Sequence, residues 1–155
     1  ATKTYERLGY FDRWAPARQR LLSGFAAQGL DIAGAFARWT DDASAFMHSV
    51  NHPAIRCLRD VARLVVRAAG LEDRSPHFAP HDNLLNGPMF PVFPEIAERY
   101  SVEGSYRFKL GGQYRHVDLA EFIRGSYETY DRTGRDAIAV PSGYAALHEK
   151  IVQAF

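Results

Sequence analysis

The chain has 155 residues, which is enough for one compact domain with a hydrophobic core and too few for two comfortable domains. We therefore expect residues 1–155 to form a single domain. Hydrophobic residues make up 46% of the chain and charged residues 24%, a balance that excludes disordered and low-complexity proteins. The net charge of +1 excludes a protein that coats nucleic acid, so any anion site must be local.

The apolar runs, the cysteine content and the arginine content indicate where the protein is located and what it could bind. The longest apolar runs have only a few residues and are bounded by charges, so we expect no membrane span. The one cysteine, Cys57, cannot form an internal disulfide, which favours a reducing cytoplasm as the location. Of the 19 basic residues 16 are arginine, whose guanidinium suits forked binding of a phosphate or carboxylate.

Apolar residues at helical spacing predict two helices near the start of the chain. The first has Pro16 in its first turn and ends near Gly29. The second begins at Asp31, which is expected to be its N-cap, and stops at the polar residues 40–42. Its expected core residues are Ile32, Phe36 and Trp39.

A turn then separates a short strand from a long helix. Alternating side chains predict the strand over residues 45–50, and Asn51-His52-Pro53 ends it because a residue before proline avoids the helical conformation. Pro53 is expected at the first helical position, with Asn51 as a candidate cap and Gly70 as the stop. The stripe expected to be buried consists of Ile55, Leu58, Ala62, Val65 and Ala69.

A proline-rich segment follows this helix. Five of the eight prolines fall within residues 76–94, among large apolar side chains. A disordered linker would lack those side chains, so we expect the segment to lie across the body of the protein or against a ligand or partner. We also expect it to share one cavity with the Asn51-His52-Pro53 turn. Pro94 opens a short helix that runs through Tyr100.

The rest of the chain predicts a hairpin and two more helices. The hairpin strands are residues 105–109 and 113–117, joined by two glycines. Asp118 and Glu121 have capping-box spacing and start the first helix, and Ser142 is expected to cap the last one. These elements together predict a mainly α fold with a few short strands.

Two histidines flank the turn before the long helix. His48 and His52 could both reach a pocket at the start of that helix, where free N–H groups and the helix dipole favour an anion. The alternative is that Asn51 and His52 only stabilise the turn itself. Both interpretations stay open from the sequence.

Other polar patterns also have two interpretations. Four arginines recur along the long helix: Arg56, Arg59, Arg63 and Arg67. They form either a phosphate-binding strip or a solvated face paired with Asp60. His77, His81 and Asp82 are of metal-ligating types, but a proline-interrupted loop does not place them on one helical face, so we expect surface positions and no metal. Cys57 is expected to be a buried structural thiol.

The order of several segments is more specific than their periodicity. LDI at 30–32 and FMHSVNHP at 46–53 precede the long helix, NGPMFPVFPEIA at 86–97 follows it, and LAEFI comes at 119–123. This order resembles the WcbI-type capsular polysaccharide biosynthesis proteins of bacteria. The Asn-His-Pro turn and the Asn-Gly-Pro segment are its most specific parts.

The resemblance implies the helical part of a larger α/β architecture that binds coenzyme A or acetyl-CoA. It implies an acetyltransferase, or the helical portion of one, acting on a sugar of a surface polysaccharide. His52 or His48 would be the catalytic base that takes a proton from the sugar hydroxyl. The proline-rich segment would cover the pantetheine arm. The candidate coenzyme-binding residues are Asn51, Arg56, Arg63, Asn86 and Gly87.

The resemblance also exposes a gap. Members look as though they begin with a strand and a Gly-Asn-Cys-Gln turn that supplies an active-site cysteine, and this sequence has no such motif. We therefore expect the carboxy-terminal part of a longer protein, completed by an amino-terminal portion or by an oligomer. The alternative function is a non-catalytic binding or assembly module that docks to a partner through its proline-aromatic segment.

Overall fold

The computed structural model describes residues 2–74, 77–112 and 114–153, and the predicted mainly α fold is confirmed in them. Residues 76 and 113, which the sequence analysis placed in the proline-rich segment and the hairpin, lie outside these ranges. The α-helices of the described part are α1 (Thr2–Arg7), α2 (Trp14–Ala26), α3 (Ala33–Asp41), α4 (Ile55–Ala68), α5 (Pro94–Tyr100), α6 (Leu119–Thr133) and α7 (Ala145–Val152).

Two small antiparallel sheets and four 3₁₀ turns complete the described elements. Strand β1 (Met47–Ser49) pairs with β2 (His52–Pro53), and β3 (Phe108–Lys109) pairs with β4 (His116–Val117). The 3₁₀ turns are η1 (Phe11–Arg13), η2 (Asn83–Asn86), η3 (Arg135–Ala137) and η4 (Ser142–Tyr144).

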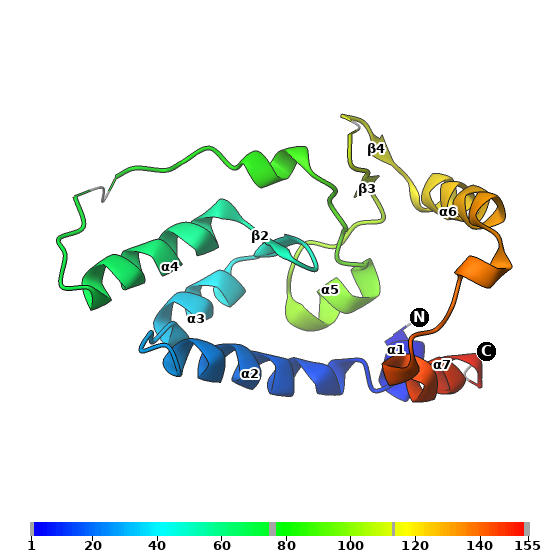
Figure 1. The fold of residues 1–155 in the computed structure, drawn as a ribbon, viewed down its shortest axis with the longest axis horizontal. Coiled ribbons are helices and arrows are strands. Elements are labelled where there is room, and N and C mark those ends of the chain that lie inside the picture. The colour runs from blue at the N-terminus through cyan, green and yellow to red at the C-terminus, as the bar shows by residue number, and fades with distance from the viewer. Residues whose placement is uncertain (1, 75–76, 113, 154–155) are drawn as a thin grey trace.

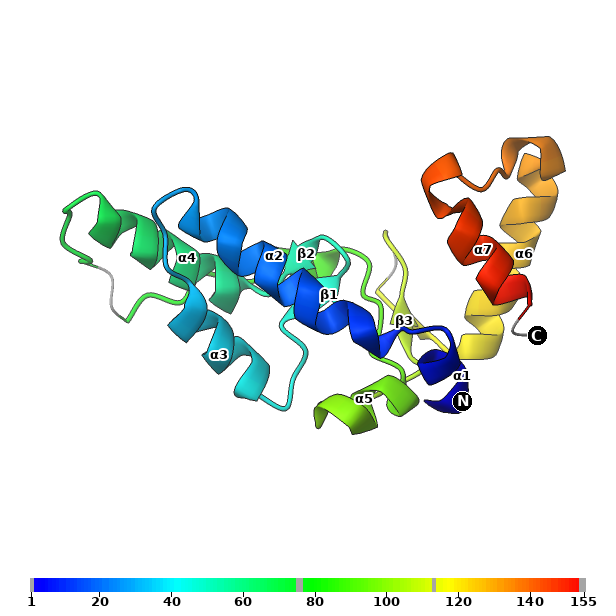
Figure 2. The same cartoon turned by 90° about the horizontal axis from the view of Figure 1, so that it is seen from below.

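The helices are arranged around the two sheets in an elongated molecule. In Figure 1, α2 and α4 run along the long axis with α3 between them, and residues 77–82, just before η2, pass along the outer side of α4. The β3–β4 hairpin and α6 lie at the other end, as Figure 2 shows from a second direction. Lys150 of α7 donates a hydrogen bond to the Leu8 carbonyl (3.2 Å), so the two ends of the chain lie near each other.

The first helices form much as their sequence predicts. Pro16 lies in the first turn of α2, where its missing N–H costs no hydrogen bond. The Asp31 carboxylate accepts a hydrogen bond from the Ala33 N–H (2.9 Å), although Ile32 occupies the N-cap position of α3. The predicted N-terminal signal of α3 is therefore right to within one residue.

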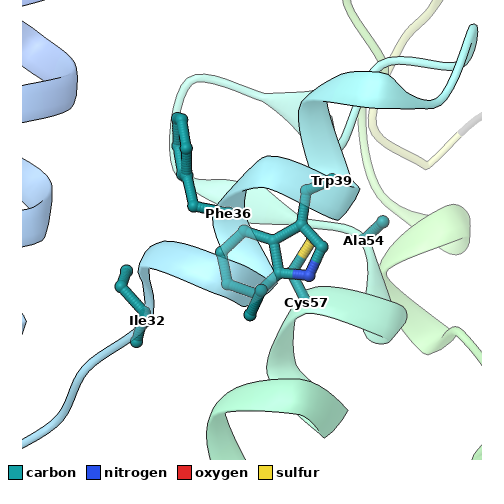
Figure 3. Close-up of a cluster of buried hydrophobic side chains, with 6 residues drawn as sticks. Ile32, Phe36, Trp39, Ala54 and Cys57 are labelled. Carbon is teal, nitrogen blue, oxygen red and sulfur yellow. The ribbon is translucent and has the colours of Figure 1, made fainter.

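The main core lies where α3 crosses the start of α4. Figure 3 shows Phe36 and Trp39 of α3 with Ala54 and Cys57 from the start of α4, and Ile32 is 1% exposed beside them. The buried positions predicted for α3 are thus confirmed. Burying each large side chain contributes about 1.5–3 kcal/mol, so this cluster fixes α3 against α4.

The predicted start of α4 is wrong by two residues. His52 and Pro53 form β2 and pair with Ser49 and Met47, so Pro53 belongs to a hairpin and not to the helix. The N-cap of α4 is Ala54, which has no capping side chain, and Asn51 is exposed in the hairpin turn. Gly70, with a positive φ of 71°, ends the helix as predicted.

The predicted buried stripe of α4 is also wrong. Cys57 is 3% exposed and, with Val61 and Leu64, faces the core, whereas Leu58 and Val65 of the predicted stripe are 43% and 47% exposed. Two apolar stripes lie next to each other on this helix, and α3 packs against the one that contains Cys57. The residues of the second stripe point away from that core.

A second core lies between the β3–β4 hairpin and α6. Phe108 and Val117 are 2% and 3% exposed, and Phe122 of α6 stacks on Phe108 with ring centroids 4.1 Å apart. The Asp118 carboxylate accepts the Glu121 N–H (2.8 Å), which confirms the predicted cap of α6. The cap predicted at the start of the last helix is wrong, because residues 142–144 form η4 and α7 begins after it.

Candidate functional site

One cleft of about 520 Å³ lies between the two cores. One wall consists of residues from β1 and the first turn of α4, including His48 and Arg56. A second wall is the part of the proline-rich segment that we call the strap, residues 86–93, which contributes residues 89–92. The third wall comes from the loop and hairpin that contain Arg107 and His116. Residues on either side of the Asn51-His52-Pro53 turn share this cleft with the proline-rich segment, but the three turn residues themselves do not line it.

Backbone hydrogen bonds hold these walls together. The Phe90 N–H donates to the His48 carbonyl (2.9 Å), which joins the strap to β1. Met89 and Lys109 exchange two backbone hydrogen bonds of 2.8 and 3.0 Å, which join the strap to β3. The strap therefore runs as a short extended segment between the β1–β2 and β3–β4 hairpins. These backbone hydrogen bonds fix the positions of its side chains along the cleft.

His48 is held in the cleft by a carboxylate. Its Nε2 lies 2.9 Å from Asp82 Oδ2, and the two side chains are 12% and 11% exposed. A carboxylate can only accept, so a neutral His48 carries its proton on Nε2 and presents Nδ1 as the unprotonated nitrogen. A histidine oriented in this way by a carboxylate is equipped to act as a general base.

Asp82 also caps the long helix. The same oxygen, Oδ2, accepts a hydrogen bond from the Ile55 N–H (2.9 Å) at the first position of α4. The helix lacks a cap from its own chain segment, and a carboxylate there interacts favourably with the positive end of the helix dipole. The surface position predicted for Asp82 is therefore wrong, because the side chain faces the protein interior and binds two groups.

His52 and Asn51 do not line the cleft. The His52 Nδ1 lies 2.7 Å from Ser49 Oγ, and the Ser49 hydroxyl lies 3.2 Å from Asn51 Oδ1. These contacts stabilise the tip of the β1–β2 hairpin. Of the two histidines singled out from the sequence, the structure therefore brings only His48 to the cleft.

Arg56 lines the cleft but is already engaged. Its Nη1 donates to the Asp42 carboxylate and to Ser44 Oγ (2.9 Å), and its Nη2 donates to the Ser44 carbonyl (3.2 Å). Hydrogen bonds from Ser44, together with the nearby Arg56 charge, lower the pKa of Asp42 below its ordinary value. Arg56 is thus neutralised and forms part of the wall.

The other residues predicted to bind the coenzyme lie outside the cleft lining. Arg63 pairs with Asp73, with Nε and Oδ2 3.3 Å apart. Asn86 is exposed at the end of η2, and Gly87 follows it in the strap, two residues before the part that lines the cleft. Arg59 Nε lies 3.9 Å from Asp60 Oδ1, so Arg59 has a carboxylate partner as Arg56 and Arg63 do, and the side chains of these arginines are half-buried.

The hairpin supplies site residues that the sequence analysis missed. Arg107 and His116 both line the cleft, and Arg107 has no carboxylate within ion-pair distance among the residues described here. Glu103 lines the same wall and is the acidic side chain there. The signal lies in the pairing of the hairpin: Arg107 comes just before β3 and two residues before Lys109, which pairs with His116, so an extended chain places Arg107 and His116 on the same side.

Cys57 is the buried structural thiol that was predicted. It is 3% exposed, its Sγ lies 3.6 Å from the Phe46 carbonyl, and burial raises the pKa of its thiol. His77 and His81 are exposed, and in the described part of the chain no three metal-ligating side chains gather at one point. Within the same residues, no helix combines the length and apolar character needed to cross a membrane.

The segment that contains α1 to α4 and the β1–β2 hairpin, with His48 and Arg56, can be compared with known families. Residues 1–74 match the family model of WcbI, a polysaccharide biosynthesis enzyme. This match confirms the predicted resemblance and connects the chain to polysaccharide biosynthesis. It ends before Asp82, the strap and the hairpin. No curated protein and no solved structure matches the chain.

Proposed function

We propose that the cleft is the acyl-transfer site of a coenzyme A-dependent acetyltransferase that modifies a sugar of a surface polysaccharide. The observation that carries the proposal is His48, oriented by Asp82 and lining a cleft of a size typical of small-molecule sites. The WcbI match supplies the polysaccharide context. The sequence resemblance is the reason for naming acetyl-CoA as the acyl donor.

The residues of the cleft fit such a donor. Met89, Pro91 and Val92 provide an apolar wall for a pantetheine arm. Arg107 is the cation best placed to bind a phosphate, because Arg56 is already paired with Asp42. We therefore assign the principal coenzyme contacts to these cleft residues and no longer to Arg56, Arg63, Asn86 and Gly87.

The chemistry assigned to His48 is general base catalysis. Nδ1 takes the proton of a sugar hydroxyl while the hydroxyl oxygen bonds to the acetyl carbonyl carbon. The bond from that carbon to sulfur then breaks, and the imidazolium returns its proton to the departing thiolate. Asp82 stabilises the imidazolium between these steps, as a buried carboxylate does for a catalytic histidine. Base catalysis of this kind contributes about 10²–10⁴ in rate.

The test compares two histidines of the same chain. His48→Gln should abolish acetyl transfer from acetyl-CoA to a saccharide while the protein stays folded. His81→Gln is the matched control, because His81 is exposed and lies outside the cleft, and it should leave the rate unchanged. Thermal shift with coenzyme A should show stabilisation of the wild type at millimolar ligand. Equal rates for the two variants would contradict the proposal.

A binding or assembly module is the second candidate function. The observation in its favour is that α6 buries no side chain fully, and Tyr127 and Tyr130 on its outer side are 63% and 50% exposed. Exposed aromatic groups of this kind are common at protein interfaces. Light scattering coupled to size-exclusion chromatography distinguishes the two, since a pure assembly module would associate through α6 and show no response to coenzyme A.

A further inference from the structure

Helix α6 carries an exposed apolar stripe, which we call the α6 face. It consists of Ile123, Tyr127 and Tyr130, which recur at steps of four and three residues and are 45%, 63% and 50% exposed. The helical repeat places this stripe about 100° away from Phe122, the ring that packs on Phe90 and Phe108. One side of α6 therefore fixes the helix to the second core, and a different side faces solvent.

The two tyrosines of the α6 face are arranged as anchors for another protein. Their rings pack against each other with centroids 6.1 Å apart and an interplanar angle of 80°. Within the part of the chain that the structure describes, neither hydroxyl has a hydrogen-bond partner. Rigid aromatic side chains with a polar end are enriched at the centres of protein interfaces. Because none of these residues lines the cleft, the α6 face is a surface separate from the candidate site.

The chain also exposes more surface than a self-contained domain of its mass. Its accessible surface is 11396 Å², whereas a folded monomer of 17.4 kDa exposes about 7,900 Å². The surplus of about 3,500 Å² is several times the roughly 800 Å² that each partner buries in a standard interface. The area needed for a stable assembly is therefore present, and α6, at one end of the molecule in Figure 1, offers aromatic groups for its centre.

The charges beside the α6 face identify the partner. Arg124, Glu128 and Asp131 recur along one flank of it, with the basic residue in the first half of the helix and the acidic residues in the second. None of the three belongs to an ion pair among the described residues. Two copies of α6 that pack antiparallel about a two-fold axis bring the same flank of each together, in opposite directions. Arg124 of each copy then lies beside Asp131 of the other, whereas parallel helices would place like charges together.

We propose that the α6 face is the interface of a two-fold homodimer, in which α6 packs antiparallel on α6 of a second copy. Tyr127 lies near the middle of the stripe and thus next to the two-fold axis. The net charge of +1 creates no general repulsion between two copies. This inference goes beyond both candidate functions, because it names a single partner for α6 and applies equally to an acetyltransferase that works as a dimer.

Sedimentation velocity on the full chain measures the dimer directly. At about 100 µM the wild type should have twice the mass of one chain. Tyr127→Ser should raise the dissociation constant of the dimer by about tenfold or more, because it removes the central ring. Tyr114→Ser is the matched control, since Tyr114 is 92% exposed but lies outside α6, and it should dimerise as the wild type does. Circular dichroism checks that both variants keep the helix content of the wild type.

An exchange of charges tests whether the partner is a second copy. Arg124→Glu and Asp131→Arg should each raise the dissociation constant by about tenfold, because each change places like charges together across the axis. An equimolar mixture of the two variants should form a dimer of nearly wild-type affinity, since the two changes together restore opposite charges at the interface. A partner other than a second copy would not produce this rescue.

The inference is overturned when the wild type is a monomer at about 100 µM, whether or not another protein binds α6. It is also overturned when Tyr127→Ser dimerises as tightly as Tyr114→Ser, or when mixing the two charge variants restores no dimer. A dimer that depends on Tyr127 but transfers no acetyl group would overturn the proposed reaction and leave this inference standing. A monomer that transfers acetyl groups would do the reverse.

Discussion

Asp82 Oδ2 lies 2.9 Å from His48 Nε2 although 34 residues separate the two along the chain. The same oxygen binds the first N–H of α4. One carboxylate therefore joins the proline-rich segment, the β1–β2 hairpin and the long helix. The contact explains how a loop without regular structure can complete a site whose other residues lie on strands and helices.

Two substitutions of Asp82 distinguish the effect of its charge from the effect of its hydrogen bonds. Asp82→Asn keeps an oxygen that can accept from both His48 and Ile55, so the free energy of unfolding should stay within about 1 kcal/mol of the wild type. The rate of acetyl transfer should fall by about 10²–10⁴, because a neutral amide does not stabilise the imidazolium. Asp82→Ala should lose activity and, in addition, about 1–3 kcal/mol of stability, because the N–H of Ile55 loses its partner. Urea unfolding and a transfer assay on both variants check this, and identical stabilities for the two would contradict it.

A hydrogen bond between α3 and α4 should contribute measurably to stability. Trp39 Nε1 donates to Asp60 Oδ2 (2.9 Å), and Trp39 is 6% exposed. Trp39→Phe removes the donor and some buried surface, so we expect a loss of about 1–3 kcal/mol in the free energy of unfolding. Trp14→Phe is the control, because Trp14 is 39% exposed, and its loss should stay below about 1 kcal/mol. Chemical denaturation of both variants provides the measurement.

Two glycines should respond in opposite directions to the same change. A Cβ on Gly104 would meet Ala97 Cβ and Pro94 Cα at 2.7 Å each, so Gly104→Ala should destabilise the protein by about 1–3 kcal/mol and displace a wall of the cleft. A Cβ on Gly24 within α2 meets nothing within 4 Å, so Gly24→Ala should stabilise by about 0.5–1 kcal/mol. Thermal unfolding of the two variants measures both signs, and a Gly104→Ala protein as stable as the wild type would show that the loop can move without cost.

The pair of Tyr106 and Glu95 should make stability depend on pH at both extremes. The Tyr106 hydroxyl donates to Glu95, which lowers the pKa of Glu95 and raises the pKa of Tyr106 to about 12. A lowered carboxyl pKa gives stability above the unfolded value of 4.5 that is lost as the pH falls through the folded value. A raised tyrosine pKa gives stability below the unfolded value of 10.0 that is lost as the pH rises toward 12. In Tyr106→Phe the urea midpoint of unfolding should change less with pH at both the acidic and the alkaline end. An unchanged pH dependence would show that other groups cause it.

Local signals predicted the elements whose ends are fixed by nearby residues. Helix α5 begins at Pro94 and ends before Ser101 as predicted, because proline suits the first helical position and Ser101 adopts a left-handed conformation (φ 53°). Helix α6 begins after Asp118 for a similar reason, since its cap lies three residues from its donor. In both cases the determining contacts are within one turn of the helix.

Long-range contacts explain what the sequence did not predict. The start of α4 depends on Asp82, 27 residues away, and no local pattern indicates that distance. The buried face of α4 was mistaken because two apolar stripes compete, and only the packing of α3 selects the one with Cys57. The place of His48 beside the turn predicted that it could reach a pocket, and the family resemblance implied a catalytic base there. Its carboxylate partner, Asp82, was not predicted. Arg107 and His116 could have been found by pairing the predicted hairpin strands and asking which side chains share a face.

The stack of Phe122 on Phe108 makes the cleft dependent on a helix that contributes none of its lining. A protein shortened to end before Leu119 would keep the core of α3 and α4 and should stay helical there. It would lose Phe122, whose ring packs against Phe90, and the strap would lose this packing contact. Shortening the chain at that point should therefore change the shape of the cleft before it lowers the stability of the amino-terminal helices.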